Sequence, residues 1–380
     1  MIPDPVKLTK ELISYNSVSQ LTNVPITNHV SNVLKSIGFK VEELPYKDAN
    51  GVAKLSIIGK LGKGTGGLTM MSHNDVVPAV NAEDWTGSPF SARLSDGRLH
   101  GRGAADMKGP LAASICAAAH FKAKTLNAPV YIVVTADEEV NARGAYDVTN
   151  HSDFFEEAKD GNGLICEPTG LRVVYAHKGG LSIRIESKGR AAHTSTLKGT
   201  NANLKMIPFL GEMVKINELV LSSKRYRNEE FDPPSSEWCI GINDHNLAMN
   251  VSPVQSVCQL AYRLMPSVNV APLIERTRNC AAKNGLKCNI LKQHKPLYTP
   301  PDSPLVQTAL KLTGTRKPKT VPYGTDGVAY STKMKRLIVL GPGSISQAHT
   351  VDEWIEIKQL HKAVDIYSRF IDHFCVNIEA

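Results

Sequence analysis

The chain has 380 residues, of which 42% are hydrophobic, so it is long enough to bury a full core in two domains or in one large one. Lysine and arginine together number 44 against 36 aspartates and glutamates, which gives a formal net charge of +8. A basic surface can bind nucleic acid, but here the basic residues are scattered, and the densest short run is RKPK (316–319). No recognition helix, zinc finger or aromatic RNA-binding signature accompanies them, so the sequence predicts no nucleic-acid partner.

The sequence shows no pattern typical of a signal peptide, a membrane-spanning helix or a disulfide framework. The segment MIPDPVKLTK lacks the charged and then apolar pattern of a signal peptide, and no apolar stretch reaches the roughly 18 residues that a membrane span needs. The seven cysteines are odd in number and lack CxxC spacing, which favours neither a disulfide framework nor a thiolate zinc site. We therefore expect a cytoplasmic protein without a membrane partner.

The first 177 residues alternate between helical and strand-like segments. Two helices come first, the earlier one beginning at Asp4-Pro5 and the later one ending at Gly38. Apolar runs of strand length follow at 54–61, 68–73, 129–135 and 163–166, with a helix at 111–122. Such alternation predicts an α/β domain whose mostly parallel sheet is covered by helices on both faces.

Residues 178–291 follow a different order. The segments are a strand (181–189), a helix (near 201–222), two strands (near 238–242 and 254–264), a helix (271–285) and a strand (287–292). This is the split β-α-β-β-α-β pattern, and the simplest interpretation is a smaller α+β domain inserted into the first. The first domain, residues 1–177, then resumes at 292–380. It adds a strand at 336–341 and closes with a helix whose apolar face consists of Leu360, Val364, Tyr367, Ile371 and Phe374.

Residues of the types that bind metal ions follow several of the predicted strands. In open parallel sheets ligands bind beyond the carboxyl ends of the strands, so these positions are the first candidates for a site. They are His73 and Asp75 in SHND, Glu138 and Glu139 in TADEEV, Glu167 in CEPTG, His349 in SQAHT, and Asp106 in the glycine-rich loop GRGAADMKG (101–109).

Each candidate also has an ordinary structural explanation. A single histidine after a strand is more often a structural residue than a ligand, and a glutamate such as Glu138 or Glu139 is often a solvated loop charge. Asp106 can cap the helix that follows it, and Glu167 precedes a turn-forming proline. The convergence of histidines and carboxylates on strand and loop ends favours one common site over these separate explanations.

Metal chemistry accounts for this set of residues. Imidazole and carboxylate suit zinc, cobalt or manganese, and the lack of nearby thiolates disfavours a closed structural zinc site. Five ligands are too many for one tetrahedral ion that also holds water, whereas two ions about 3.5–4 Å apart can share an aspartate and a water. Asp75, two residues after His73 and on the same strand face, can accept the ring N–H that orients the histidine.

The adjacent glutamates indicate two different roles. Neighbouring side chains in an extended segment point in opposite directions, so if Glu139 faces a metal ion, Glu138 is free to face the bridging water. Glu138 is then the predicted general base, and it later returns the proton to the leaving amine. Asp137, the first of the three carboxylates, receives no role.

An ordered set of motifs spans nearly the whole chain: SHNDVVP, WTGSPF, DGRLHGRGAADMKG, TADEE, CEPTG, AHKGGLSIRIESKGRAAHTSTLKGTNAN and LGPGSISQAHTVDEW. In these segments the chain resembles the family of co-catalytic zinc deacylases and exopeptidases that includes acetylornithine deacetylase, succinyl-diaminopimelate desuccinylase, aminoacylase and glutamate carboxypeptidase. The acetylornithine deacetylase branch looks most similar, chiefly through the AHKG segment and the GPG-x3-QAH segment.

The resemblance implies two zinc ions per chain, with cobalt or manganese as alternatives. The implied ligands are His73, Asp106 and Glu167 on one zinc, and Asp106, Glu139 and His349 on the other. It also implies Glu138 as the acid/base and Asp75 as the residue that supports His73.

The inserted domain resembles the family's dimerisation or lid domain. There, a histidine that matches His193 in AAHTS reaches the active site of the partner subunit and stabilises the oxyanion, which implies a homodimer. Arg263 in YRLMP and Asn250 in NVSP match positions that hold the substrate carboxylate or carbonyl. The turn YGTDG (323–327), with Gly324 and Thr325, matches a substrate-contacting turn. Without the resemblance, an exposed loop position for His193 and a solvated one for Arg263 are the simpler explanations.

The predicted reaction is hydrolysis of the amide bond of a small-molecule N-acyl-L-amino acid, as in acetylornithine deacetylase. Two departures leave the substrate open. Ala261 stands where the family usually has an acidic residue two positions before Arg263, and GTDG is more typical of the carboxypeptidase and general deacylase branches. A desuccinylase, or a dipeptidase or carboxypeptidase of the same family, is an alternative. A non-catalytic metal-binding protein is another, although binding alone needs no proton-carrying Glu138.

Overall fold

The computed structural model describes residues 2–245 and 248–377 and divides the chain into two compact units. The first unit comprises Met1–Ala176, Tyr298–Lys319 and Thr325–Ala380, and the second comprises His177–Leu297 and Thr320–Gly324. The second unit contains the whole of the predicted insert. It also contains His177 and residues 292–297 and 320–324, which the sequence alone assigns to the first domain.

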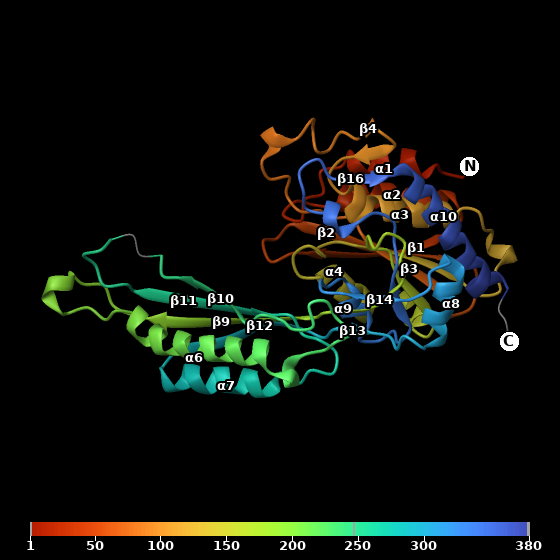
Figure 1. The fold of residues 1–380 in the computed structure, drawn as a ribbon. Helices are drawn as coiled ribbons and strands as arrows, with labels where there is room; N and C mark the ends of the chain where they lie inside the picture. Colours follow the sequence, from red (N-terminus) through yellow and green to blue (C-terminus); the bar gives the residue numbers. More distant parts are fainter. Residues whose placement is uncertain (1, 246–247, 378–380) are drawn as a thin grey trace. The chain divides into compact units, whose positions relative to one another are not determined.

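A mixed sheet, nine-stranded in the described part of the chain, forms the centre of the first unit (Figure 1). The strands lie in the order β1-β2-β6-β3-β7-β15-β8-β13, with β14 paired to β8. Their bounds are β1 (Lys40–Lys47), β2 (Ala53–Leu61), β3 (Leu68–His73), β6 (Val130–Thr135), β7 (Asn162–Ile165), β8 (Val174–His177), β13 (Leu297–Tyr298), β14 (Lys319–Val321) and β15 (Leu337–Val339). β6, β3, β7 and β15 run parallel, whereas β1, β2 and β8 pair antiparallel with their neighbours. The predicted α/β class with a parallel centre is confirmed.

Helices cover both faces of this sheet, as β2 shows. Gly59 of β2 lies next to Leu34 of α2 (Val24–Ser36). Ser56 lies next to Gly144, which belongs to α4 (Arg143–His151). Because residues of odd and even number in a strand point to opposite faces, α2 and α4 cover different faces. The central strands β3 and β6 between these layers are buried along their whole length.

α3 (Gly109–Ala118) is a wholly buried helix that packs on β3 and β6. α1 (Pro5–Ile13) and α10 (Ile357–Ile371) pack against α3 in turn (Figure 1). Asp4 caps α1 by accepting a hydrogen bond from the main-chain N–H of Lys7 at 2.8 Å. The predicted start of the first helix and the apolar face of α10 are therefore confirmed, with Phe374 half-buried just beyond α10.

The strand β1 is missing from the sequence-based prediction. Its sequence KVEELPYK is mostly half-buried or exposed, and it lies at the edge of the sheet, paired with β2. An edge strand needs no continuous apolar run and tolerates a residue such as Pro45, so a search for buried strands does not find it.

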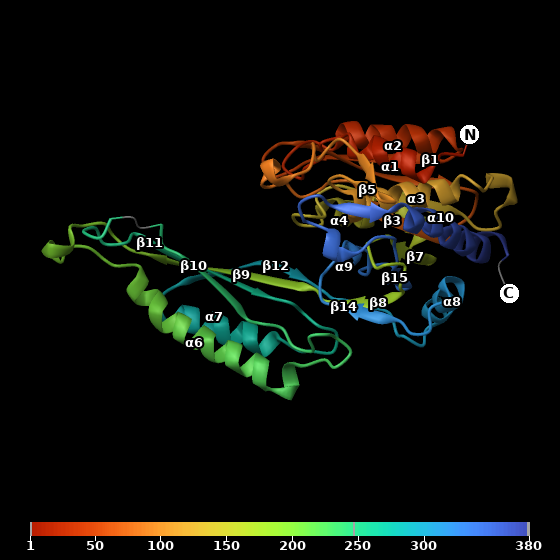
Figure 2. The same ribbon diagram turned by 45° about the horizontal axis from the view of Figure 1, so that its top comes forward.

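The second unit is a helix layer on a sheet. In its described residues, four antiparallel strands have the order β10-β11-β9-β12. The elements are β9 (Gly180–Lys188), α6 (Asn203–Ser222), β10 (Cys239–Asn243), β11 (Gln255–Tyr262), α7 (Ala271–Lys283) and β12 (Lys287–His294), so the predicted β-α-β-β-α-β order is confirmed. α6 and α7 lie side by side against the sheet (Figure 2). Alternate residues of β9, such as Ile183 and Ile185, form a core with apolar residues of both helices, such as Phe209 and Leu273.

The remaining elements are short. A sheet of three described strands consists of β4 (Arg93–Ser95), β5 (Arg98–His100) and β16 (Trp354–Glu356), with β5 in the middle. The short helices of the first unit are α5 (Asp153–Ala158), α8 (Pro304–Thr313) and α9 (Gly327–Tyr330). Single turns lie at Ala82–Asp84, Ala104–Lys108, Ala123–Thr125, Thr194–Thr196, Lys224–Tyr226, Ile345–Gln347 and Asp372–Val376. Within residues 2–245 and 248–377, no helix combines the length and apolar character that crossing a bilayer requires.

Candidate metal and catalytic site

Three neighbouring parallel strands deliver the candidate side chains to one place in the first unit. β3 lies between β6 and β7 and ends at His73 itself. Glu138 and Glu139 follow the end of β6, and Glu167 follows the end of β7. Because parallel strands end at the same edge of the sheet, these side chains meet there, as the sequence analysis expects.

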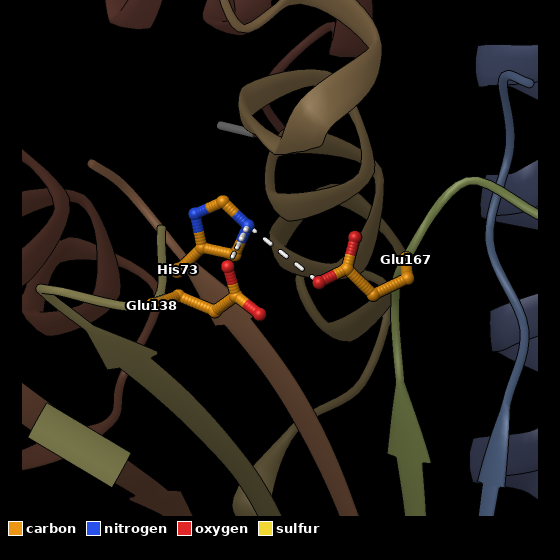
Figure 3. A group of neighbouring side chains, drawn as sticks. All are labelled: His73, Glu138 and Glu167. Carbon is orange, nitrogen blue, oxygen red and sulfur yellow. Dashed lines mark ion pairs between the residues drawn. The ribbon is translucent and has the colours of Figure 1, made fainter. Parts of the chain in front are cut away.

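The ring nitrogen Nε2 of His73 is the centre of the first cluster. It lies 3.1 Å from Oδ1 of Asp106, 3.6 Å from Oε1 of Glu167 and 4.0 Å from Oε2 of Glu138. Figure 3 shows the carboxylates of Glu138 and Glu167 approaching this nitrogen from two sides. The three side chains other than Glu138 are almost wholly buried.

His349 forms the centre of the second cluster. Its Nε2 lies 3.4 Å from Oδ2 of Asp106 and 3.1 Å from a carboxylate oxygen of Glu139. The histidine side chain is about half exposed and stands on a main chain with a φ of 62°. Asp106 therefore presents one oxygen to His73 and the other oxygen to His349.

These distances fit ligands that share metal ions. Two donor atoms that each lie about 2.0–2.1 Å from a tetrahedral zinc ion are themselves about 3.4 Å apart. The separations around His73 and His349 fall close to this value, with Asp106 between them. A carboxylate with its oxygens aimed at two imidazoles has the geometry of a bridging ligand. The donor set, imidazole and carboxylate without thiolate, suits zinc, cobalt or manganese.

Burial strongly affects the acids of the site. Burial raises the pKa of Glu138 well above its usual value, and the nearby Glu167 charge adds to this effect. Burial also raises the pKa of Glu167 to about 7 and raises that of Glu139, although the hydrogen bond with His349 opposes the latter. Carboxyl groups so crowded lose charge unless cations compensate them, and divalent ions would supply that compensation.

Asp106 and its two histidines behave differently. Burial acts to raise the pKa of Asp106, but hydrogen bonds with His349 and His73 outweigh it and hold the pKa below its usual range. The same bonds to Asp106 and Glu139 raise the pKa of His349 to about 10. In the absence of metal, the imidazoles thus carry the positive charge that the acids require.

Asp75 holds the site together through the main chain. Its carboxylate accepts a hydrogen bond from the Ser19 hydroxyl at 2.6 Å and from the main-chain N–H groups of Glu138 and Glu139 at 3.3 and 3.4 Å. The expected contact with the His73 ring is longer, at 3.6 Å from Nδ1. The nearest acceptor for that nitrogen is the main-chain carbonyl of Asp75, at 3.0 Å.

The segment that carries the two glutamates is a turn, which differs from the extended segment assumed in the sequence analysis. Asp137 has a φ of 62°, and its carbonyl accepts hydrogen bonds from the N–H groups of Asn141 and Ala142 at 2.9 and 2.8 Å. A tight turn lets adjacent side chains face one cavity, so Glu138 and Glu139 both reach the site from neighbouring positions.

Asp137 and Asp326 are two further buried acids of this region, and the sequence predicts no role for either. The Asp137 carboxylate lies 2.9 Å from Nζ of Lys54 and accepts a hydrogen bond from the Tyr46 hydroxyl at 2.8 Å. Asp326 accepts a hydrogen bond from the hydroxyl of Thr135, at the end of β6, and burial raises its pKa to about 7. A run of three carboxylates signals Asp137 in the sequence, whereas Asp326 is signalled only by its place in the YGTDG turn.

The predicted substrate-binding residues fall mainly in the second unit. Thr325 is buried in the first unit, where its hydroxyl accepts a hydrogen bond from the N–H of Gly327 at 3.0 Å. His193, Asn250, Arg263 and Gly324 belong to the second unit.

Within the second unit these residues form two neighbourhoods. His193 forms a β-bridge with Val251, beside Asn250. Arg263, just after β11, lies beside Gly324 and lines a cavity of about 500 Å³ that Ala261 also lines. Ala261, where the resemblance leads us to expect an acidic residue, therefore contributes no charge to this cavity.

A sequence comparison decides the family. The model of peptidase family M20/M25/M40 matches residues 69–373, a stretch that contains all five predicted metal ligands. The chain belongs to this family. It is accordingly an enzyme, a metallohydrolase of family M20/M25/M40, and the resemblance noted in the motifs is confirmed.

Two acetylornithine deacetylases align with nearly the whole length of this M20 chain. An acetylornithine deacetylase from Photorhabdus laumondii is 31% identical over 99% of this chain and 98% of its own length. An acetylornithine deacetylase from Klebsiella pneumoniae is 30% identical over 98% of both chains.

Several solved structures share the fold at lower identity. A metallo-carboxypeptidase from Sulfolobus solfataricus aligns with a TM-score of 0.74 at 19% identity, covering 98% of this chain and 99% of that one. Human carnosine dipeptidase 1 aligns with a TM-score of 0.70 at 18% identity, covering 97% and 96%. A Bacillus subtilis protein described as a dinuclear metal-binding peptidase of family M20 aligns with a TM-score of 0.66 at 13% identity, covering 97% and 96%.

Proposed function

We propose that this chain hydrolyses the amide bond of N-acyl-L-amino acids with two zinc ions, and that N-acetylornithine is its preferred substrate. Cobalt or manganese would substitute for zinc. The observation that supports the reaction is Asp106, whose two oxygens face His73 and His349. The full-length identity of about 30% with acetylornithine deacetylases supports the substrate, and with it a role in arginine biosynthesis in the cytoplasm.

The proposed ligands follow the two clusters. His73, Asp106 and Glu167 would hold one ion, and Asp106, Glu139 and His349 would hold the other. When bound, such ions polarise the amide carbonyl and lower the pKa of water. The protein itself holds the ligands in place. The Asp75 carboxylate accepts hydrogen bonds from the main-chain N–H groups of Glu138 and Glu139, and the Asp75 main-chain carbonyl accepts one from the His73 ring.

Glu138 is the proposed proton carrier. Its carboxylate lies 4.0 Å from His73 Nε2, farther than those of Asp106 and Glu167, which leaves it free to contact a water or a substrate atom. Burial raises the pKa of Glu138, as suits a group that takes a proton from the attacking water and gives it to the leaving amine. A proton-carrying group beside a ligand set favours an enzyme over a protein that only stores metal.

Substrate recognition is assigned to the residues that match the family's motifs. Arg263 supplies a fixed positive charge for a carboxylate, with Asn250, Gly324 and Thr325 as polar partners of the substrate. His193 of a second copy of the chain would stabilise the oxyanion. This last role requires a homodimer.

Two features of the second unit support a homodimer. An apolar stripe on α6 is left exposed: Leu204, Ile207, Val214 and Leu221 are 66%, 59%, 49% and 45% exposed. Three of its members recur every seven residues, the spacing of a helix face that packs on another helix. β10 is an edge strand of the sheet, and its Ile242, which is 60% exposed, lines one pocket together with Ile207 of the stripe. An open edge strand next to an apolar stripe suits a second copy of the same surface.

A substrate screen tests the proposed function. The purified protein, reconstituted with zinc or cobalt, is assayed for amine release from N-acetylornithine, N-succinyl-diaminopimelate, N-acetylmethionine and simple dipeptides, with Glu138→Gln as the parallel blank. We expect the highest kcat/KM with N-acetylornithine. A preference for the succinylated substrate or for dipeptides would move the assignment to a desuccinylase or a dipeptidase. Turnover of every substrate at the level of the blank would overturn the hydrolase proposal.

A further inference from the structure

The loop that presents Asp106 needs an external support. It runs from Gly101 to Lys108, and Gly103 within it has a φ of 83°. The main chain of Asp106 itself departs from helical geometry, with φ and ψ of −125° and 95°. The main-chain N–H groups of this loop therefore cannot all be satisfied by the carbonyls of a regular helix.

Glu353 supplies these acceptors from a distant part of the sequence. Its Oε1 accepts hydrogen bonds from the N–H groups of Ala105 and Asp106 at 2.8 and 3.0 Å. Its Oε2 accepts from the N–H of Gly103 at 2.9 Å and from Nη1 of Arg102 at 2.8 Å. A carboxylate offers about four acceptor positions, so all of those on Glu353 are engaged by this one loop.

The environment of Glu353 makes this arrangement specific. The side chains of Glu353 and Arg102 are both buried, and they form an ion pair. A buried carboxylate is stable only where its charge is balanced and its oxygens are hydrogen-bonded. The loop can thus occupy one arrangement around the carboxylate and would lose several bonds in any other.

The main chain of Glu353 adds a link to the second histidine. Glu353 lies four residues after His349 in the sequence, and its carbonyl accepts a hydrogen bond from the N–H of Gly101 at 2.9 Å. The strand β16 follows at once and pairs with β5, which leads into the loop. Glu353 therefore ties the segment that carries Asp106 to the segment that carries His349.

We propose that Glu353 is a positioning residue of the metal centre, which fixes the Asp106 main chain so that its two carboxylate oxygens face His73 and His349. The proposal rests on the two-ion site of the proposed function. Glu353 touches no ligand side chain and acts through three main-chain N–H groups and Arg102. Partners that orient metal ligands typically change metal affinity by about 10- to 100-fold when they are replaced.

Glu353→Gln is the direct test. The amide keeps the shape but turns one acceptor oxygen into a donor that faces N–H or guanidinium groups. The zinc content is measured after dialysis against a graded series of chelator concentrations, and the cobalt-loaded protein is followed by its visible absorption. We expect zinc to leave at about 10- to 100-fold lower chelator concentration than in the wild type, with an altered cobalt spectrum. Asp352→Asn is the matched control, because Asp352 bonds to Thr86 and not to the loop.

A melting experiment separates positioning from a general loss of stability. If Glu353 positions the ligands, the rise in melting temperature on adding zinc shrinks in the variant. An unchanged rise, or a wild-type chelator profile, overturns the proposal while the two-ion site stands. A wild-type protein that binds no ions overturns both. If Glu353→Gln does not fold, Glu353→Asp serves instead: it keeps the charge but is too short to reach all four donors, and retention of wild-type zinc affinity in it counts against the proposal.

Discussion

Lys54 and Asp137 form an ion pair with Nζ and Oδ1 2.9 Å apart, and both side chains are buried. The ammonium also donates to the main-chain carbonyls of Ser19 and Leu21 at 2.6 and 2.8 Å. The three consecutive carboxylates of TADEEV are thus of two kinds. Asp137 is neutralised by a cation of the chain itself, and only the two glutamates remain to be compensated by metal.

Replacement of Lys54 by methionine should strongly destabilise the protein. The substitution leaves Asp137 buried without a counter-charge, and breaking a buried pair in this way typically costs about 3–5 kcal/mol. The free energy of unfolding is measured in urea. Lys35→Met is the control, because the pair of Lys35 with Glu43 is about half exposed and should contribute about 1 kcal/mol or less. Equal losses in the two variants would show that the buried pair has no special role.

Glu138→Gln should separate catalysis from metal binding. General acid–base groups contribute about 100- to 10,000-fold to the rate, so kcat should fall by at least 100-fold while the metal content stays near that of the wild type. Glu139→Gln, a change of the same size at the next residue, should instead lower the metal content because Glu139 is a proposed ligand. Metal analysis and steady-state kinetics measure both effects. Full activity in Glu138→Gln would remove Glu138 from the mechanism.

Asp106→Asn should disturb both ions at once. The amide offers one acceptor oxygen in place of two charged ones, so it cannot serve His73 and His349 in the same way. We expect the zinc content to fall below that of the wild type and the activity to be lost. Asp84→Asn, at an exposed position of the first unit, is the control and should leave both unchanged. A variant that keeps its full zinc content would exclude a bridging role for Asp106.

The stability of the protein should fall in mild acid because of His177. Burial lowers the pKa of His177 from 6.5 to about 4. Between these values the unfolded chain binds a proton that the folded chain does not, so this contribution to stability is complete above the unfolded pKa and is lost as the pH falls toward the folded one. At pH 5 the loss amounts to about 2 kcal/mol.

His177→Gln tests this pH dependence. Glutamine does not titrate and can still donate to the carbonyl of Lys178, as Nδ1 of His177 does at 3.0 Å. The free energy of unfolding should therefore drop less between pH 7.5 and pH 5 in the variant than in the wild type. His151→Gln, at an exposed position, should retain the wild-type drop. Identical drops in all three proteins would contradict the assignment.

The α6 stripe should control the oligomeric state. Glutamate at both Ile207 and Val214 places charges on the proposed interface, so the double variant should be monomeric in light scattering where the wild type is a dimer. Leu94→Glu changes an exposed apolar residue of the first unit and should have no such effect. A double variant that remains dimeric would place the interface elsewhere.

The sequence is sufficient to predict which residues meet at the site when each of them directly follows an apolar strand. His73, Glu139 and Glu167 follow apolar runs that become neighbouring parallel strands, so the rule for strand ends brings them together. The distances then agree with a common site, while their roles as ligands stay a prediction. The sequence pattern does not say which strands are neighbours, and the structure shows that β3 lies between β6 and β7 and parallel to both.

Residues whose partners are distant in the sequence cannot be predicted from strand ends or from local motifs. Glu353 is one charged residue near the end of a motif, and its four hydrogen bonds to residues about 250 positions away appear only in the fold. Lys54 looks like an exposed charge within a strand, yet it is buried against Asp137. An extended chain predicts that Glu138 and Glu139 point in opposite directions, whereas the left-handed conformation of Asp137 makes a turn. Such backbone geometry depends on long-range contacts.

The single carboxylate between His73 and His349 has a thermodynamic consequence. Whatever occupies one oxygen of Asp106 changes the charge density and the freedom of the other, so occupancy at the two positions is linked, and the linkage is reciprocal. The first ion to bind relieves the mutual repulsion of the acids and orients Asp106, but it also brings a positive charge close to the second position. The affinity measured for either position should accordingly depend on whether the other one is filled, so the two binding curves are not independent.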